Sequence, residues 1–181
     1  MKLKNSSWQW LMMTVTAKTA ALIIAGDNLQ FKSVKKTYGM EGEGFIANIY
    51  LNNKKVGVYN DFADGGGGYP VFDTVEAEKR VDSLIAEWTA KSTDKTVKAL
   101  FEADPRIIDF SFLAEGLINL VEDEKLFKMG IKKGYKCLAR NDRGTCVQYP
   151  SNWPIEEVRK DMEKEGLTTL YTELKDFIHI I

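Results

Sequence analysis

Two short apolar segments, 45–51 and 56–62, separated by a turn that contains two asparagines, constrain the fold of this chain more than any other feature. Asn52 and Asn53 tolerate the positive φ angles of tight hairpin turns, so we expect antiparallel strands over about residues 44–62. Apolar side chains occupy odd positions in the first segment and even positions in the second, which an even-length turn places on one face. The predicted apolar face comprises Phe45, Ala47, Ile49, Leu51, Val56, Val58 and Phe62, and the opposite face Asn48, Tyr50, Lys55, Gly57 and Tyr59.

A second hairpin is predicted over residues 135–149, where two apolar strands flank the turn sequence Asn-Asp-Arg-Gly. An even-length turn places Cys137 and Cys146 on the same face, and a disulfide is geometrically conceivable only if they lie directly opposite each other. The chain has only these two cysteines, and such sparse usage is typical of a reducing compartment. We therefore expect free thiols.

Apolar residues at helical spacing predict several amphipathic helices around the hairpins. The first would begin at Ser6 or Ser7 and end at Gly26, and another would begin with the capping pair Asp73 and Glu76. Further helices are predicted from Asp104–Pro105 towards residue 129, from Ser151 or Asn152 through Pro154, and over residues 167–181, and a strand with a bulge near Ser33 is predicted over residues 29–38.

This order of elements predicts an α+β fold in which an antiparallel sheet, built on β-hairpins, packs with amphipathic helices. A polar break around residues 91–95 is the candidate boundary between two lobes, 1–94 and 95–181, which could also form one continuous domain. The first lobe would hold the glycine-rich loop.

The N-terminal apolar run from Trp8 to Ala25 imitates a signal sequence or membrane anchor. Lys18 interrupts that run, and a charge at the centre of a membrane span is costly. A hydrophobic fraction of 44% with 28% charged residues is that of an ordinary globular protein. We therefore expect a cytoplasmic protein with no membrane partner.

Charge is segregated along the chain although the net charge is only −1. Residues 61–124 are strongly acidic, whereas residues 125–149 carry seven basic side chains and one acidic one. Blocks of opposite charge can steer a partner or face each other within the fold. The basic block, together with Tyr135 and Tyr149, is also compatible with nucleic-acid contact.

Few side chains in this sequence are suited to catalysis. His179 is the only histidine, and its predicted place on the last helix, away from the apolar stripe, favours a surface role. Schemes that need a serine–histidine pair, a cysteine–histidine pair or several histidines therefore lack their central component, and no cofactor or catalytic residue is predicted.

The loop that holds four consecutive glycines, Gly65–Gly68, has three interpretations. It is a mobile connector, a surface for partner docking, or a phosphate or metal site. A phosphate loop would need a Lys-Ser/Thr pair, which is absent. Asp61 and Asp64, perhaps with Glu41, Glu43 or Asp73, are candidate ligands for Mg²⁺ or Ca²⁺.

The segment Gly42–Gly57, followed by the acidic and glycine-rich loop Asp61–Gly68, resembles a hairpin of small orphan proteins from phages and mobile elements. Proteins of this kind, the anti-CRISPR proteins included, bind and disable a host defence complex. The resemblance implies a compact protein that acts by occupying a surface, with a host protein or ribonucleoprotein complex as partner. It implies no active-site residue.

The leading hypothesis is therefore a stoichiometric inhibitor of a host defence nucleoprotein, such as a CRISPR effector. The alternatives are a metal-dependent nuclease or phosphotransfer enzyme that uses Asp61 and Asp64, and a direct nucleic-acid-binding protein. The expected partner-binding residues are Lys54, Lys55, Lys132, Lys133, Lys136, Arg140 and Arg143.

Overall fold

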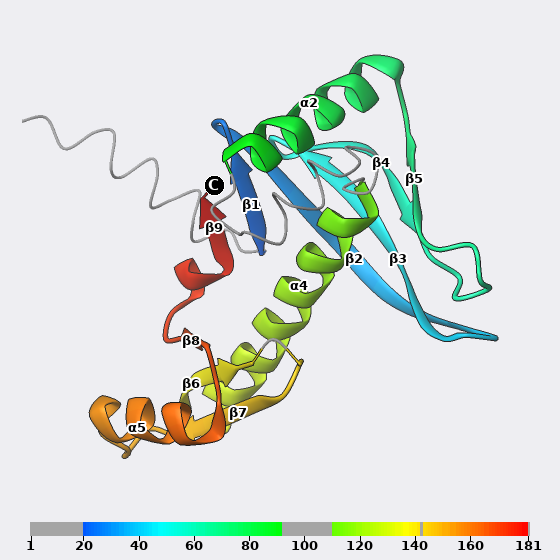
Figure 1. Cartoon of the computed structure of the whole chain (residues 1–181). Helices are drawn as coiled ribbons and strands as arrows, with labels where there is room; N and C mark the ends of the chain where they lie inside the picture. The colour runs from blue at the N-terminus through cyan, green and yellow to red at the C-terminus, as the bar shows by residue number, and fades with distance from the viewer. Residues whose placement is uncertain (1–19, 92–109, 142, 181) are drawn as a thin grey trace, which may run out of the picture. The chain divides into compact units, whose positions relative to one another are not determined.

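The computed structural model describes residues 20–91, 110–141 and 143–180, which form helices and two sheets (Figure 1). These residues fall into two units. Residues 122–177 make one, called here the small-sheet unit, and the described residues 20–121 with 178–180 make the other, the large-sheet unit. The fold is α+β with mainly antiparallel pairing, as the sequence predicts.

The large-sheet unit contains a six-stranded sheet in the order β5-β4-β3-β2-β1-β9. All neighbours pair antiparallel except β1 and β9, which run parallel. The strands are β1 (Ala21–Ile24), β2 (Asp27–Gly39), β3 (Gly42–Leu51), β4 (Lys54–Asn60), β5 (Tyr69–Phe72) and β9 (Ile178–Ile180).

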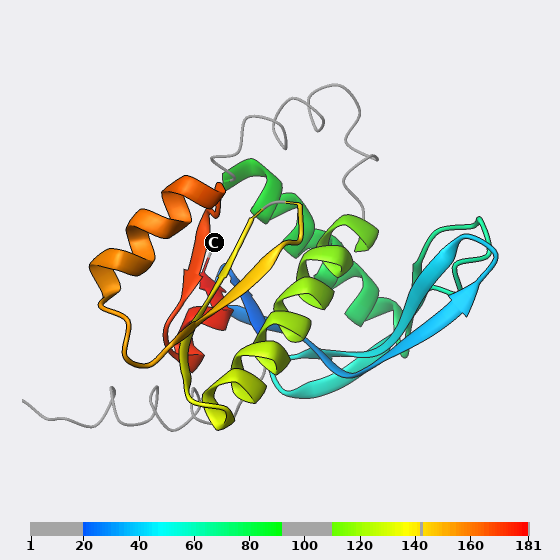
Figure 2. The same cartoon turned by 90° about the horizontal axis from the view of Figure 1, so that it is seen from below.

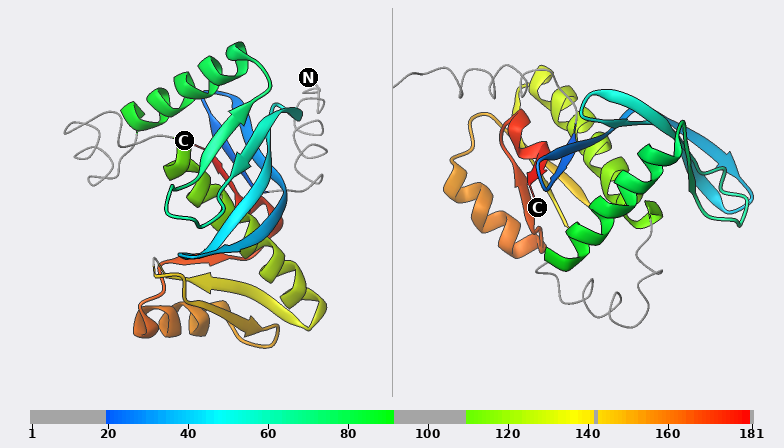
Figure 3. Two further views of the ribbon diagram at one scale, coloured as in Figure 1. Left: turned by 90° about the vertical axis from the view of Figure 1, so that its right-hand side faces the viewer. Right: turned by 90° about the horizontal axis from the view of Figure 1, so that it is seen from above.

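Helix α2 (Val75–Lys91) crosses this sheet, since it contacts both β1 and β5, which lie four strands apart (Figure 3). Its first turn is capped by Thr74, whose Oγ1 accepts a hydrogen bond from the N–H of Ala77 at 3.1 Å, one residue later than the predicted cap Asp73. The buried stripe of the helix consists of Val81, Leu84, Ile85 and Thr89.

An aromatic cluster forms part of the core of this unit. Phe110, at the start of α4 (Phe110–Lys132), packs against Phe31, Tyr59 and Phe72, with ring centroids 5.7–6.0 Å away. Phe31 and Tyr59 also stack on each other at 5.6 Å. These contacts bury the inner face of the sheet beside Leu29 and Ile49.

The first hairpin is confirmed and Val56 is buried as predicted, but the predicted phase of its second strand is wrong from Gly57 onwards. Asn52 and Asn53 both adopt positive φ, as expected, and join β3 to β4. The register then shifts between Ile49 and Tyr50, so that Tyr59 pairs with Ala47 and turns inward, whereas Val58 lies on the opposite face. A bulge adds one residue to β4 and reverses the alternation that sequence parity assumes.

Two further predictions concern the start of this unit. The bulge near Ser33 is confirmed by a register shift between Lys32 and Lys35 and by a φ of 57° at Ser33. The predicted first helix is wrong over Ala21–Ile24, which form β1, because Gly26 closes a hairpin with β2 rather than ending a helix. The rest of that helix, up to residue 19, lies outside the described residues.

The small-sheet unit contains a three-stranded antiparallel sheet in the order β7-β6-β8. Helix α5 packs on one face through Val158 and Met162, which meet Cys137, Ala139 and Tyr149. The other elements of the unit are the second half of α4 and a short 3₁₀ helix, η1. The bounds are β6 (Tyr135–Arg140), β7 (Cys146–Pro150), α5 (Ile155–Glu165), β8 (Thr169–Tyr171) and η1 (Leu174–Phe177).

The second hairpin is confirmed as β6 and β7, but its connection has five residues instead of four. Arg140 pairs with Cys146, and Cys137 pairs with Tyr149, so the two cysteines lie on opposite faces. This corrects the expectation of a shared face. Both thiols are free, as expected.

The predicted last helix is also wrong. Residues 169–180 form β8, η1 and β9, because Leu170 and Tyr171 pair with β6 and residues 178–180 pair with β1. His179 therefore lies on an edge strand of the large sheet. Tertiary strand pairing has overridden a helical spacing of apolar residues.

The predicted lobe boundary between residues 94 and 95 lies outside the described residues, and the division observed falls between Val121 and Glu122, inside α4. Helix α4 continues past the predicted end at Gly130 to Lys132. Among the described helices, none combines the length and the apolar composition needed to cross a bilayer.

Candidate interaction surface

One end of the large sheet is formed by the β2–β3 hairpin and the β4–β5 loop, which run side by side away from α2 (Figures 1 and 2). The end of the hairpin exposes two large apolar side chains, Tyr38 on β2 at 74% and Met40 in the turn at 93%. The loop and the start of β5 add Phe62 and Tyr69, which are also exposed. We call Tyr38, Met40, Phe62 and Tyr69 the tip surface.

Backbone hydrogen bonds fasten the loop to the hairpin. The N–H of Glu41 donates to the carbonyl of Ala63 at 2.9 Å, and the N–H of Asp61 donates to that of Phe45 at 2.8 Å. The hydroxyl of Thr37 donates to the carbonyl of Asp61 at 2.6 Å. Hydrogen bonds between the hairpin and the loop therefore hold the backbone that carries the tip surface.

Two glycines of the hairpin allow this close approach. A Cβ atom on Gly39 would lie 2.2 Å from the carbonyl oxygen of Phe62, and one on Gly44 would lie 2.4 Å from that of Asp61. Any other residue would push the loop away. Gly39 and Gly44 are thus explained by packing of the hairpin against the loop.

The glycine run is fixed at its C-terminal end. A Cβ atom on Gly68 would lie 1.8 Å from the hydroxyl oxygen of the buried Tyr59, and the carbonyl of Gly68 accepts a hydrogen bond from Ser111 Oγ at 2.7 Å. Gly65 and Gly67 adopt positive φ angles of 93° and 69°. Positive φ angles at Gly65 and Gly67 and the close contact at Gly68 therefore explain three of the four glycines.

The two candidate metal ligands of this loop take part in its turns. Asp61 Oδ1 accepts a hydrogen bond from the N–H of Ala63 at 2.9 Å, and Asp64 Oδ1 accepts one from that of Gly66 at 3.4 Å. Within the part of the chain that the structure describes, no group of three or more His, Cys, Asp or Glu side chains is placed to hold a metal ion.

The predicted basic residues are divided between the two units. Lys54 and Lys55 are exposed at the start of β4, in the large-sheet unit. The other five belong to the small-sheet unit: Lys132 at the end of α4, Lys133 in the turn after it, Lys136 and Arg140 on β6, and Arg143 in the β6–β7 connection.

Two of these basic side chains have internal partners. Lys136 Nζ donates to the backbone carbonyl of Trp153. Arg140 Nη1 lies 2.7 Å from Asp123 Oδ2, and the side chain of Asp123 is only 3% exposed. Arg140 thus neutralises a buried carboxylate of its own chain, and its removal would leave that charge unpaired.

Polar groups around Asp123 complete a buried cluster. Burial, reinforced by the charge of Asp123, raises the pKa of the Cys146 thiol, whose Sγ lies 3.8 Å from Asp123 Oδ1. Burial and the same carboxylate raise the pKa of Tyr171 to about 12. A thiol with a raised pKa is protonated at neutral pH and is a poor nucleophile. The cluster therefore acts as a structural tie between α4 and β6.

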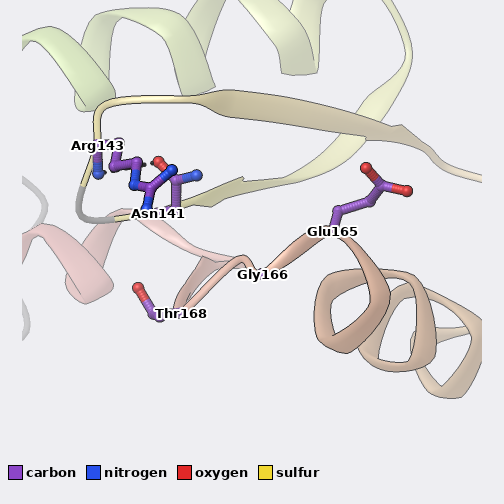
Figure 4. Close-up of a pocket in the computed structure, with 5 residues that line it drawn as sticks. All are labelled: Asn141, Arg143, Glu165, Gly166 and Thr168. Carbon is purple, nitrogen blue, oxygen red and sulfur yellow. Dashed lines mark hydrogen bonds between the residues drawn. The ribbon is translucent and has the colours of Figure 1, made fainter.

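Arg143 lines a shallow polar pocket of about 320 Å³ in the small-sheet unit (Figure 4). Asn141 Oδ1 shapes its wall by accepting hydrogen bonds from the N–H groups of Arg143 and Thr145. Figure 4 shows Arg143 and Glu165 on opposite sides of the pocket. The sequence predicts Arg143 as a binding residue but gives no sign of Glu165 and Thr168, which folding alone brings to the same pocket.

The sequence patterns did not predict Tyr38 and Met40 as binding residues. Their only signal was the position of Met40 between Gly39 and Gly42, where a large apolar side chain in a glycine-flanked turn has little opportunity to be buried.

Comparisons with protein family models, with curated proteins and with solved structures found no match for this chain.

Proposed function

We propose that this protein acts by stoichiometric binding, and that the tip surface makes the contact. The observation that carries the proposal is the exposure of Tyr38 and Met40, at 74% and 93%, on a hairpin that backbone hydrogen bonds hold in place. Large apolar side chains that are exposed close together in a structure are candidates for an interaction surface. A surface that is ordered before binding loses little conformational entropy on association.

The proposed partner is a host defence nucleoprotein, such as a CRISPR effector, in the cytoplasm of the host cell. Support for this class comes from the resemblance of the hairpin Gly42–Gly57 and the following loop to proteins of phages and mobile elements. Occupation of a surface on the effector would block its access to nucleic acid or its nuclease activity.

The test is a titration of this protein against purified, guide-loaded CRISPR effector nucleases of several types. We expect cleavage of target DNA to stop near equimolar protein, and a complex to co-elute on gel filtration. Unchanged cleavage at saturating protein, with no complex for any effector type, would refute the choice of partner. Loss of target DNA at far substoichiometric protein without effector would refute stoichiometric binding and favour an enzyme.

Matched variants locate the contact. Tyr38→Ser with Met40→Ser removes the exposed apolar side chains, and Lys132→Ser with Lys133→Ser removes two exposed basic side chains that the sequence predicts as partner-binding. We expect only the first pair to abolish complex formation. If only the second pair of substitutions abolishes complex formation, the contact is made by Lys132 and Lys133 and not by the tip surface.

A further inference from the structure

Two carboxylates border the tip surface. Glu41 lies in the hairpin turn, and its Oε1 would be 3.2 Å from a Cβ atom on Gly65, so this carboxylate lies over the glycine run. Asp64 precedes the run and is exposed. Neither side chain forms an ion pair with any residue that the structure describes.

The lysines of the hairpin leave these charges uncompensated. Lys36 Nζ lies 2.7 Å from Glu43 Oε2, so those two side chains neutralise each other. Lys35 pairs with Ile46, four residue pairs before the closing pair of Gly39 and Gly42. Among the described residues, the end of the hairpin and the loop therefore combine large apolar side chains with a local excess of negative charge.

We propose, on the basis of the binding function above, that the tip surface docks onto a protein surface where Lys or Arg side chains flank an apolar pocket. Met40 and Tyr38 would enter the pocket, while Glu41 and Asp64 would form charge-assisted hydrogen bonds with the basic side chains. Complementary charge of this kind directs association and selects the partner.

The same charges argue against nucleic acid as the direct ligand of this surface. Nucleic acids bind through cationic side chains that replace counterions around the phosphates. Glu41 and Asp64 would repel a phosphate backbone at the place where the apolar side chains are exposed. The partner at the tip surface is therefore a basic protein surface, even when that protein itself carries nucleic acid.

The experiment uses two fluorescent peptides as probes, one that alternates Arg with Leu and Trp, and one with Glu in place of every Arg. A labelled DNA duplex is the third probe. We expect the full-length protein to bind the basic peptide at least about tenfold more tightly than the other two probes, measured by anisotropy, with affinity that falls as salt rises.

The double variant Glu41→Gln with Asp64→Asn keeps the size of both side chains and the acceptor for the N–H of Gly66. It should lose about tenfold in affinity for the basic peptide, one factor of ten being about 1.4 kcal/mol. The control Glu156→Gln with Glu157→Gln removes two exposed carboxylates from α5 in the other unit and should change nothing. Equal loss in both variants, equal binding of both peptides, or preference for the duplex would refute the proposal.

The basic-partner proposal and the proposed function can fail independently of each other. If effector binding persists near equimolar ratio while Glu41→Gln with Asp64→Asn has no effect on it, the binding function stands and the basic partner surface is wrong. If the peptides behave as expected but no effector forms a complex, the partner class is wrong and the recognition chemistry stands.

Discussion

At the residue scale, the glycine run shows how close packing fixes amino-acid identity. Gly68 lies against Tyr59, a 4% exposed side chain that stacks on Phe31, whereas a Cβ atom on Gly66 would meet only Asp64 Oδ1 at 3.5 Å. Gly66 also lies outside the positive-φ positions of the run. Close packing therefore requires glycine at position 68 but not at position 66.

We expect Gly68→Ala to destabilise the protein by about 1–3 kcal/mol, because Tyr59 must leave its place in the aromatic cluster. Urea unfolding followed by circular dichroism measures the change. Gly66→Ala is the matched control and should stay within about 0.5 kcal/mol of the parent protein. Equal effects at both positions would contradict the packing role assigned to Gly68.

Tyr171 predicts a response to alkaline pH. Burial first, and the charge of Asp123 second, raise its pKa from 10.0 to about 12 in the folded protein. The folded state therefore holds the phenol proton more tightly than the unfolded state, and this stabilisation is complete below pH 10 and disappears as the pH rises towards 12.

We expect the free energy of unfolding of the parent protein to fall between pH 10 and 12, and Tyr171→Phe to make that fall shallower, because phenylalanine has no proton to lose. Urea unfolding at a series of pH values gives the comparison, with Tyr69→Phe, an exposed tyrosine, as control. Parallel curves for the parent protein and Tyr171→Phe would show that Tyr171 does not contribute.

At the element scale, Asn52 and Asn53 have different structural roles in the turn between β3 and β4. Asn52 Oδ1 accepts a hydrogen bond from the N–H of Asn28 at 2.9 Å, and its Nδ2 donates to Asp27 Oδ1 at 2.6 Å. Both Asn52 and Asn53 have positive φ, which glycine adopts without strain. Only the first asparagine ties the turn to the start of β2.

We expect Asn52→Gly to destabilise the protein by about 1–2 kcal/mol, since it removes both hydrogen bonds while keeping the turn conformation. Asn53→Gly should be neutral or stabilise the protein by a few tenths of a kcal/mol, as glycine suits such turns. Thermal and urea unfolding of the two variants provide the measurement. A larger loss at Asn53 than at Asn52 would contradict this assignment.

The bulges explain where sequence alternation failed for single elements. The bulge near Ser33 could be predicted because the apolar phase of β2 visibly shifts between Phe31 and Val34. The one between Ile49 and Tyr50 could not, because Val56 and Val58 follow a regular alternation that gives no sign of an added residue. Tyr59 turns inward because its ring packs in an aromatic cluster. That cluster includes Phe110, which lies far from Tyr59 in the sequence.

At the scale of the whole molecule, the chain returns to the large sheet after completing the small one. Residues 178–180 form β9 beside β1, with Ala21 opposite Ile178, although the preceding residues 122–177 belong to the small-sheet unit. This edge strand is held by pairing between segments more than 150 residues apart, which no local pattern reveals.

We expect deletion of residues 178–181 to expose the backbone of β1 while leaving the small sheet intact. Hydrogen exchange followed by mass spectrometry should show faster exchange in β1 (Ala21–Ile24) and unchanged protection in β6 (Tyr135–Arg140), because only β1 loses its neighbour. Unchanged exchange in β1 would show that β9 contributes nothing to the sheet.

The fold class, both hairpins and the asparagine turn could be predicted from the sequence alone, because they depend on neighbouring residues: backbone preferences of Asn and Gly, and alternation of apolar side chains. Three features became visible only in the folded chain: the face that Tyr59 occupies, the ion pair of Arg140 with Asp123, and the strand formed by residues 178–180. Folding also brought Phe62 beside the end of the hairpin that exposes Tyr38 and Met40. These features depend on contacts between distant segments, whose energy outweighs the weak preference of each segment alone.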